Sequence, residues 1–122
     1  LNGMPGVLSA RWAGGHGDDA ANYTLLLAQL RDVPDERRGA AFVSACALVT
    51  GPDDVTVVRG QWPGVIAREP LGDNGFGYDP VFVPEGGAGS AAQLSAAEKD
   101  ALSHRGRALA LLVPALRALA RG

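Results

Sequence analysis

Two short segments of the sequence gather residue types that can recognise a flat ligand carrying oxygen atoms. The first is GFGYDP at residues 75–80, and the second is EKDALSHRGRA at residues 98–108. Together they supply aromatic rings, carboxylates, an ammonium, an imidazole and guanidiniums, which can stack on a heteroaromatic ring and form hydrogen bonds with its rim. This set of groups is suited to binding a nucleobase and its phosphates.

In the first segment, glycines stand on both sides of Phe76. They remove the Cβ atoms that would keep a ligand from the backbone, and they leave the ring available for stacking. Gly77, Tyr78 and Asp79 follow, and the carboxylate of Asp79 can accept hydrogen bonds. The same residues also fit a glycine turn that leads into a strand at 81–83, with Phe76 packed in the core. The local sequence leaves both interpretations open.

The second segment places Lys99 and Ser103 four residues apart, so that they share one face of a predicted helix. His104 and Arg105 follow at the junction between two helical stretches. A guanidinium only donates hydrogen bonds, so Arg105 aimed at a purine would favour a keto oxygen and reject an exocyclic amine. Such a site discriminates strongly, because the wrong ligand leaves buried donors unpaired. For an isolated His-Arg pair, a solvated helix end is the alternative interpretation.

The elements that must position these segments include a helix predicted over about 18–31, where apolar residues recur at helical spacing. Asp18 or Asp19 is expected to be its N-cap. Ser95 and Glu98 have the spacing of a capping box and therefore mark the start of another helix.

A final amphipathic helix is predicted over about 104–120, in which Pro114 should cause a kink or a break. Runs rich in valine predict strands, and the turn residues at 51–54 indicate a hairpin. The predicted strands are 40–50, 55–62, 65–67 and 81–83. The mixture of helices and strands indicates the α/β or α+β class with a mostly antiparallel sheet, and we predict α/β.

The 122 residues predict one domain over residues 1–122. A net charge of −2 argues against a partner that is nucleic acid or an anionic membrane. Cys46 is the only cysteine and is expected to be a small buried apolar residue in a reducing compartment, so we expect a cytoplasmic protein. No phosphate-binding glycine loop with lysine, zinc-ligand spacing or serine nucleophile motif occurs.

Three motifs in a fixed order carry a resemblance to a known family: PGVLSARWAG, then GFGYDPVFVPEG, then LSAAEKDALSHRGRAL. The sequence resembles the inosine/xanthosine triphosphate pyrophosphatase family, whose members hydrolyse non-standard purine nucleoside triphosphates (ITP, dITP, XTP) to the monophosphate and pyrophosphate. The resemblance covers nearly all of the chain. It implies an elongated α/β fold of two lobes around a long mixed sheet, with the substrate in the cleft between the lobes, and a homodimer.

The resemblance also implies roles for residues of both segments. It implies that Phe76 stacks on the purine and that His104 and Arg105 read its 6-keto edge. The other substrate-binding residues that it implies are Gly77, Tyr78, Asp79, Lys99 and Ser103. Gln93 departs from the pattern, because family members commonly have an acidic residue there.

Full members of the family carry a phosphate-binding loop, a metal-binding glutamate and an Asp-Asp-Ser-Gly-Leu segment ahead of the first motif. We therefore expect an N-terminally truncated chain that carries the base-recognition half of the site and is inactive alone. No catalytic residue and no metal ligand is assigned to it, and the ligands of Mg²⁺ are expected mainly from the upstream segment. The alternatives are a pyrophosphatase for another modified nucleotide, such as a methylated pyrimidine triphosphate, and a non-catalytic nucleotide-binding or dimerising remnant.

Overall fold

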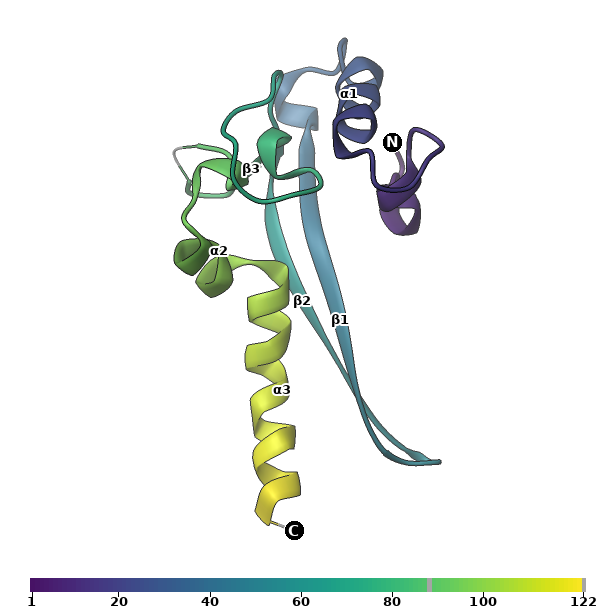
Figure 1. Ribbon diagram of the computed structural model, residues 1–122, viewed down its shortest axis with the longest axis vertical. Coiled ribbons are helices and arrows are strands. Elements are labelled where there is room, and N and C mark those ends of the chain that lie inside the picture. Colours follow the sequence, from purple (N-terminus) through teal and green to yellow (C-terminus); the bar gives the residue numbers. More distant parts are fainter. Residues whose placement is uncertain (88, 122) are drawn as a thin grey trace. The chain divides into compact units, whose positions relative to one another are not determined.

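The computed structural model describes residues 1–87 and 89–121 (Figure 1). Its main elements are α1 (Asp19–Gln29), β1 (Gly39–Gly51), β2 (Asp54–Ile66), β3 (Phe82–Pro84), α2 (Ala96–Leu102) and α3 (His104–Arg121). Short 3₁₀ turns occur at Gly6–Arg11, Asp35–Arg37, Asp79–Val81 and Ala91–Gln93. The strands form one sheet in the order β1–β2–β3. The predicted α/β class is confirmed.

β1 and β2 form the long hairpin that the sequence predicts (Figure 1). Each strand has 13 residues. Burial alternates along β1 with the period of two that is typical of a strand with one covered face. Phe42, Ser44, Cys46 and Leu48 lie on the half-buried face, and the residues between them are exposed. Cys46 is therefore half-buried on the covered face, as a small apolar residue of the strand.

β2 continues through Pro63 to Ile66, so the separate strand predicted at 65–67 is wrong. Backbone N–H groups alternate in direction along a strand. The N–H of Ile66 donates to the carbonyl just before β1, and that of Ala67 donates to the carbonyl just before β3. The nitrogen of Pro63 consequently faces the side of β2 on which β3 lies. The pairing between these two strands ends at Gly64, so the missing N–H of Pro63 costs no hydrogen bond of the sheet.

Gly64 lies within β2 and does not end the strand. Its lack of a side chain allows β3 to approach closely. The register pairs Gly64 with Pro84, Val65 with Val83 and Ile66 with Phe82. A Cβ on Gly64 would lie 2.3 Å from the carbonyl oxygen of Val83 and 2.8 Å from the ring of Phe82. Glycine is therefore required for this contact, whereas the sequence pattern suggested a boundary between strands.

Arg38 is a buried cation, 3% exposed, that joins the end of α1 to the end of β2. Its guanidinium donates to the carbonyl oxygens of Leu30, Ile66 and Ala67. Burial lowers its pKa, as does the nearby charge of Arg68. The hydrogen bonds to carbonyls offset the cost of burying the charge.

α1 begins as the sequence predicts, and the structure identifies Asp18 as its N-cap. The carboxylate of Asp18 accepts a hydrogen bond from the N–H of Ala21 at 3.0 Å. One turn into the helix, the buried amide of Asn22 donates to Ala10 and accepts from the N–H of Ala13. These bonds attach the 3₁₀ turn near the start of the chain to α1.

The capping box at the start of α2 is confirmed. Ser95 Oγ accepts from the N–H of Glu98, and the Glu98 carboxylate accepts from the N–H of Ser95, each at 3.1 Å. The hydrogen bond from the backbone N–H of Ser95 lowers the pKa of Glu98, and the side chain of Ser95 lowers it further. α3 runs through Pro114 without ending, so the break that was one of the two expected outcomes does not occur. Proline removes one hydrogen bond of the helix, whereas burial of Ala108 and Leu112 holds the remainder in place.

The chain forms two compact units, each with its own buried residues. The first unit comprises Leu1–Ala40 and Gly64–Leu94, and the second comprises Ala41–Pro63 and Ser95–Gly122. Within the described residues, the buried apolar side chains of the first unit are those of Leu26, Leu30, Val81, Phe82, Ala91 and Ala92, and those of the second are Trp62, Ala108 and Leu112. The expectation of one domain stays a prediction. None of the described helices is both long and apolar enough to span a membrane.

Candidate functional site

The loop that carries Phe76 lies in the first unit and is shaped by two glycines with positive φ. Gly75 has φ +76° and Gly77 has φ +61°, values that side chains with a Cβ rarely adopt. A Cβ on Gly75 would lie 2.1 Å from Oδ2 of Asp79. That carboxylate, which is 3% exposed, accepts a hydrogen bond from the N–H of Phe76 at 3.0 Å. The buried side chain of Asp79 thus holds the loop in its turn conformation through this hydrogen bond.

The side chain of Phe76 is 55% exposed. The interpretation of Phe76 as a core residue is therefore wrong, and the loop presents the ring to the outside. A phenyl ring in this position costs hydrophobic free energy in the free protein, which stacking on a planar ligand would recover. The strand that the alternative interpretation predicted does form, at Phe82–Pro84, so the glycine turn both leads into a strand and presents the ring.

Two further hydrogen bonds hold this loop to the start of α1 and to the 3₁₀ turn before it, within the same unit. The N–H of Gly77 donates to Oδ2 of Asp19 at 2.8 Å, and the hydroxyl of Tyr78 donates to the carbonyl of Ser9 at 2.7 Å. Burial raises the pKa of Tyr78, and the negative charge of Asp19 raises it further. Tyr78 is therefore held as the neutral donor that this bond requires.

The second group of predicted residues lies in the second unit, at the junction between α2 and α3. The N–H of Ser103 donates to the carbonyl of Lys99 and completes α2, which confirms the spacing of these two residues. The hydroxyl of Ser103 accepts a hydrogen bond from the N–H of Gly106 at 3.1 Å, so it caps α3. Ser103 is 5% exposed, and Lys99 is half-buried.

His104 and Arg105 form the start of α3, as the sequence indicates. The imidazole of His104 stacks on the ring of Phe42 in β1, with centroids 5.0 Å apart and planes at 20°. Arg105 is exposed at the next position. The stacked ring restricts the rotamers of His104, so a hydrogen bond from His104 to a ligand would need little further ordering.

Backbone contact with β2 sets the position of this first turn of α3. A Cβ on Gly60 would lie 2.1 Å from the carbonyl oxygen of His104 and 2.4 Å from the nitrogen of Ala108. Ala108 is fully buried. Beside this contact, the guanidinium of Arg107 donates to the carbonyl of Gln61 at 2.9 Å. In Figure 1, α3 accordingly runs beside the hairpin.

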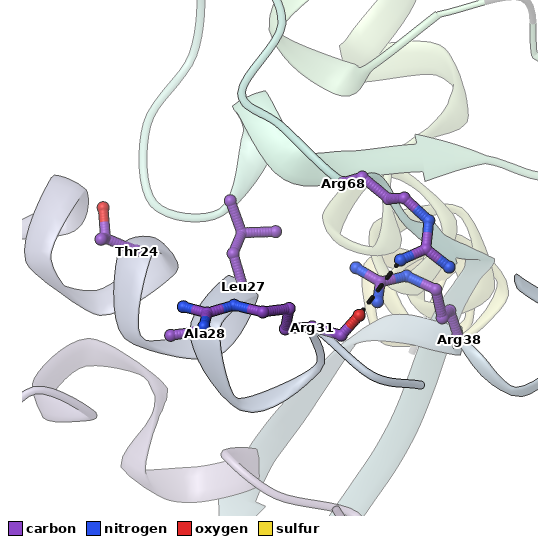
Figure 2. Close-up of a pocket in the computed structure, with 6 residues that line it drawn as sticks. All are labelled: Thr24, Leu27, Ala28, Arg31, Arg38 and Arg68. Carbon is purple, nitrogen blue, oxygen red and sulfur yellow. Dashed lines mark hydrogen bonds between the residues drawn. The ribbon is translucent and has the colours of Figure 1, made fainter. Parts of the chain in front are cut away.

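A hollow of about 430 Å³ lies elsewhere in the first unit and contains none of the predicted site residues (Figure 2). It is lined by Thr24, Leu27, Ala28, Arg31, Arg38 and Arg68. Arg68 binds Asp35 at 2.7 Å and the carbonyl of Arg31 at 3.3 Å, and Arg38 binds carbonyls as described above. Figure 2 shows the guanidinium of Arg31 pointing away from the other two. Arg38 and Arg68 hold the main chain, so we do not assign the candidate site to this hollow.

The predicted residues therefore form two groups, one in each unit. Phe76, Gly77, Tyr78 and Asp79 come together in the first unit, and Lys99, Ser103, His104 and Arg105 come together in the second. Sequence reasoning missed Asp19 and Phe42, which contact these groups. Asp19 was considered only as a helix cap, and no motif pointed to its contact with the loop or to Phe42, because their partners lie far along the chain. Across residues 1–87 and 89–121, no three histidine, cysteine or acidic side chains gather into a metal-binding group.

Comparison with known proteins bears on this arrangement. A family model described as the Ham1 family matches residues 1–115. The chain belongs to the Ham1 family. This Ham1-family chain is 79% identical, over all 122 residues, to a protein of Mycobacterium tuberculosis named dITP/XTP pyrophosphatase. It is 74% identical over 120 residues to a protein of the same name from Nocardia farcinica. These matches confirm the family resemblance of the three motifs.

Solved structures support the Ham1 fold. The chain superposes on a HAM1 protein of Coxiella burnetii with a TM-score of 0.90 at 42% identity, over 97% of this chain and 61% of the other. A nucleoside-triphosphatase / dITP/XTP pyrophosphatase of Mycobacterium abscessus gives a TM-score of 0.82 at 72% identity, over 95% of this chain and 59% of the other. The Ham1-family chain thus spans 59% of the length of its mycobacterial and 58% of its nocardial relative.

Proposed function

We propose that this chain is part of an enzyme that hydrolyses the non-standard purine nucleoside triphosphates ITP, dITP and XTP to the monophosphate and pyrophosphate. The observation that carries the proposal is the 79% identity, over the whole chain, to a protein named dITP/XTP pyrophosphatase. The exposed ring on a braced loop and the cationic start of α3 support it, because they are the groups that recognition of such a base needs.

Base recognition divides between stacking and hydrogen bonding. Phe76 stacks on the purine, with Gly77, Tyr78 and Asp79 shaping its loop. His104 and Arg105 donate to the 6-keto oxygen, which hypoxanthine and xanthine have and adenine lacks. Adenine presents an amine at the same place, and a guanidinium has no acceptor to receive its protons. Selection against ATP follows from this mismatch of donors.

Hydrolysis of the triphosphate is expected to use Mg²⁺, which would gather phosphate oxygens and position water. Among residues 1–87 and 89–121, no three histidine, cysteine or acidic side chains gather in one place. We propose that the Mg²⁺ ligands and the residue that activates water come mainly from the part of the full-length protein outside this chain. We propose further that the chain holds the base-recognition half of the site and is inactive without the remainder of the protein.

Release of pyrophosphate tests the proposed activity directly. The full-length protein should release pyrophosphate from ITP, dITP and XTP with a kcat/KM at least about 100-fold above that for ATP, a ratio expected where donors are matched to one substrate group. Equal turnover of ITP and ATP would contradict the assignment. Preference for a methylated pyrimidine triphosphate would support the alternative of a pyrophosphatase for another modified nucleotide. Nucleotide binding without hydrolysis by the full-length protein would support a binding module.

The remaining expectations concern the assembly and the location of the protein. We propose a homodimer in the cytoplasm, and sedimentation of the full-length protein with cell fractionation tests both. A purified chain that begins at Leu1 and turns over ITP would overturn the proposed inactivity of the fragment.

A further inference from the structure

Two adjacent aspartates at the start of α1 bind different parts of the molecule. Asp18 accepts from the N–H of Ala21 within the same helix, at 3.0 Å. Asp19 accepts from the N–H of Gly77, 58 residues further along the chain, at 2.8 Å. Because Asp18 already caps the helix, the bond made by Asp19 is not needed to start α1. It acts on the loop.

That loop would be mobile without such bonds. Glycine loses more conformational freedom on ordering than any other residue, and Phe76 has one on each side. Two consecutive N–H groups are held by carboxylates: that of Phe76 by Asp79 and that of Gly77 by Asp19. Each bond removes freedom at one side of the exposed ring. An ordered ring binds more tightly than a mobile one, since less entropy is lost when the ligand arrives.

We propose that Asp19 is a positioning residue for substrate recognition, which holds the Gly77 amide so that the Phe76 ring is presented in the orientation for stacking. The proposal rests on the proposed function. Asp19 does not touch the base in it and acts only through Phe76. The carboxylate suits this role because a charged acceptor forms a stronger bond with an amide than a neutral one. Its charge also contributes to the raised pKa of Tyr78, which agrees with a place beside the loop.

Steady-state kinetics of the full-length protein with ITP, comparing three single variants, tests this role. Asp19→Ala removes the acceptor and should raise KM about 3- to 10-fold with kcat within about twofold of wild type, the range for one hydrogen bond of ordinary net strength, because the bond is exposed to solvent. Asp19→Asn keeps an acceptor oxygen but loses the charge, so its KM should lie between those of the wild type and Asp19→Ala. Asp18→Ala is the matched control: it removes the neighbouring carboxylate and a helix cap, so it should lower Tm and leave KM unchanged.

Coupling to Phe76 separates positioning from general structural damage. If Asp19 acts through the ring, Asp19→Ala should have no further effect on KM in a Phe76→Ala background. Additive effects of the two substitutions, or an Asp19→Ala variant with wild-type KM, would overturn the proposal. So would an Asp19→Asn variant as impaired as Asp19→Ala. A wild-type protein without preference for ITP over ATP would instead refute the proposed function, so the two failures are distinguishable.

Discussion

Substitution of Gly60 by alanine tests whether close backbone packing sets the position of His104 and Arg105. The added Cβ would lie 2.1 Å from the carbonyl oxygen of His104, 2.4 Å from the nitrogen of Ala108 and 3.0 Å from its Cα. Ordinary contacts begin at 3.4 Å. All three atoms belong to the helix backbone, so no side-chain rotation can relieve the clash, and the first turn of α3 must retreat from β2 by about 1 Å.

We expect Gly60→Ala to cost about 1–3 kcal/mol of folding free energy, as overpacking of a closely packed contact does. A shift of about 1 Å in recognition groups can lower activity by up to about 100-fold. The preference of the full-length protein for ITP over ATP should therefore fall more than a general loss of folded protein would explain. Urea denaturation measures the first effect, and the ratio of kcat/KM values measures the second.

Gly39→Ala is the matched control, because it makes the same change in the neighbouring strand. Nothing lies within 4 Å of a Cβ at Gly39, and its φ is not in the left-handed region. This variant should keep wild-type selectivity and have unchanged or slightly higher stability. If Gly60→Ala has the stability and selectivity of Gly39→Ala, the argument that Gly60 positions the start of α3 is refuted.

Three further outcomes follow from the contacts described above. Arg105→Lys keeps the charge but loses the planar fork, so the ITP over ATP preference should fall about 10- to 100-fold, and an unchanged ratio would exclude Arg105 from base selection. Ser103→Ala removes the hydroxyl that caps α3 and should cost about 0.5–2 kcal/mol in urea denaturation, whereas an unchanged midpoint would show that the cap contributes nothing. The raised pKa of Tyr78 means that the folded state holds this proton more tightly than the unfolded state, so its contribution to stability is full below pH 10 and is lost as pH rises through the folded pKa. Tyr78→Phe should flatten that alkaline decline, and identical pH profiles for the two proteins would contradict the assignment.

Features that depend on residues close together in the chain could be predicted from the sequence. The capping box joins Ser95 to Glu98, three positions on, and the hairpin turn between β1 and β2 spans two residues, so their geometry follows from local composition. The junction at His104 was predicted for the same reason. Family membership could be recognised because the motifs keep their order along the chain.

Predictions from proline and glycine as signals for the ends of strands and helices failed where contacts with distant residues had the larger effect. The local sequence predicted that a strand ends at Pro63 and Gly64, yet β2 runs through both. No residue of β3 pairs with Pro63, and β3 approaches Gly64 closely. Pro114 indicated a possible break in the C-terminal helix, yet α3 is continuous through it and is held by the packing of its buried residues. Propensity amounts to about 1 kcal/mol per residue or less for most residues and to about 3 kcal/mol for a proline inside a helix, and tertiary contacts can override both.

The sequence by itself determined the helix starts, the hairpin and the chemical identity of the groups that could recognise a base. Only the tertiary structure decided that Phe76 is exposed, that Asp19 holds its loop and that Phe42 stacks on His104. The physical reason is that a residue's type sets which contacts it can make, whereas the path of the folded chain sets which distant partner it meets. Two neighbouring aspartates of equal charge illustrate this, because one caps its own helix and the other binds an amide 58 residues away.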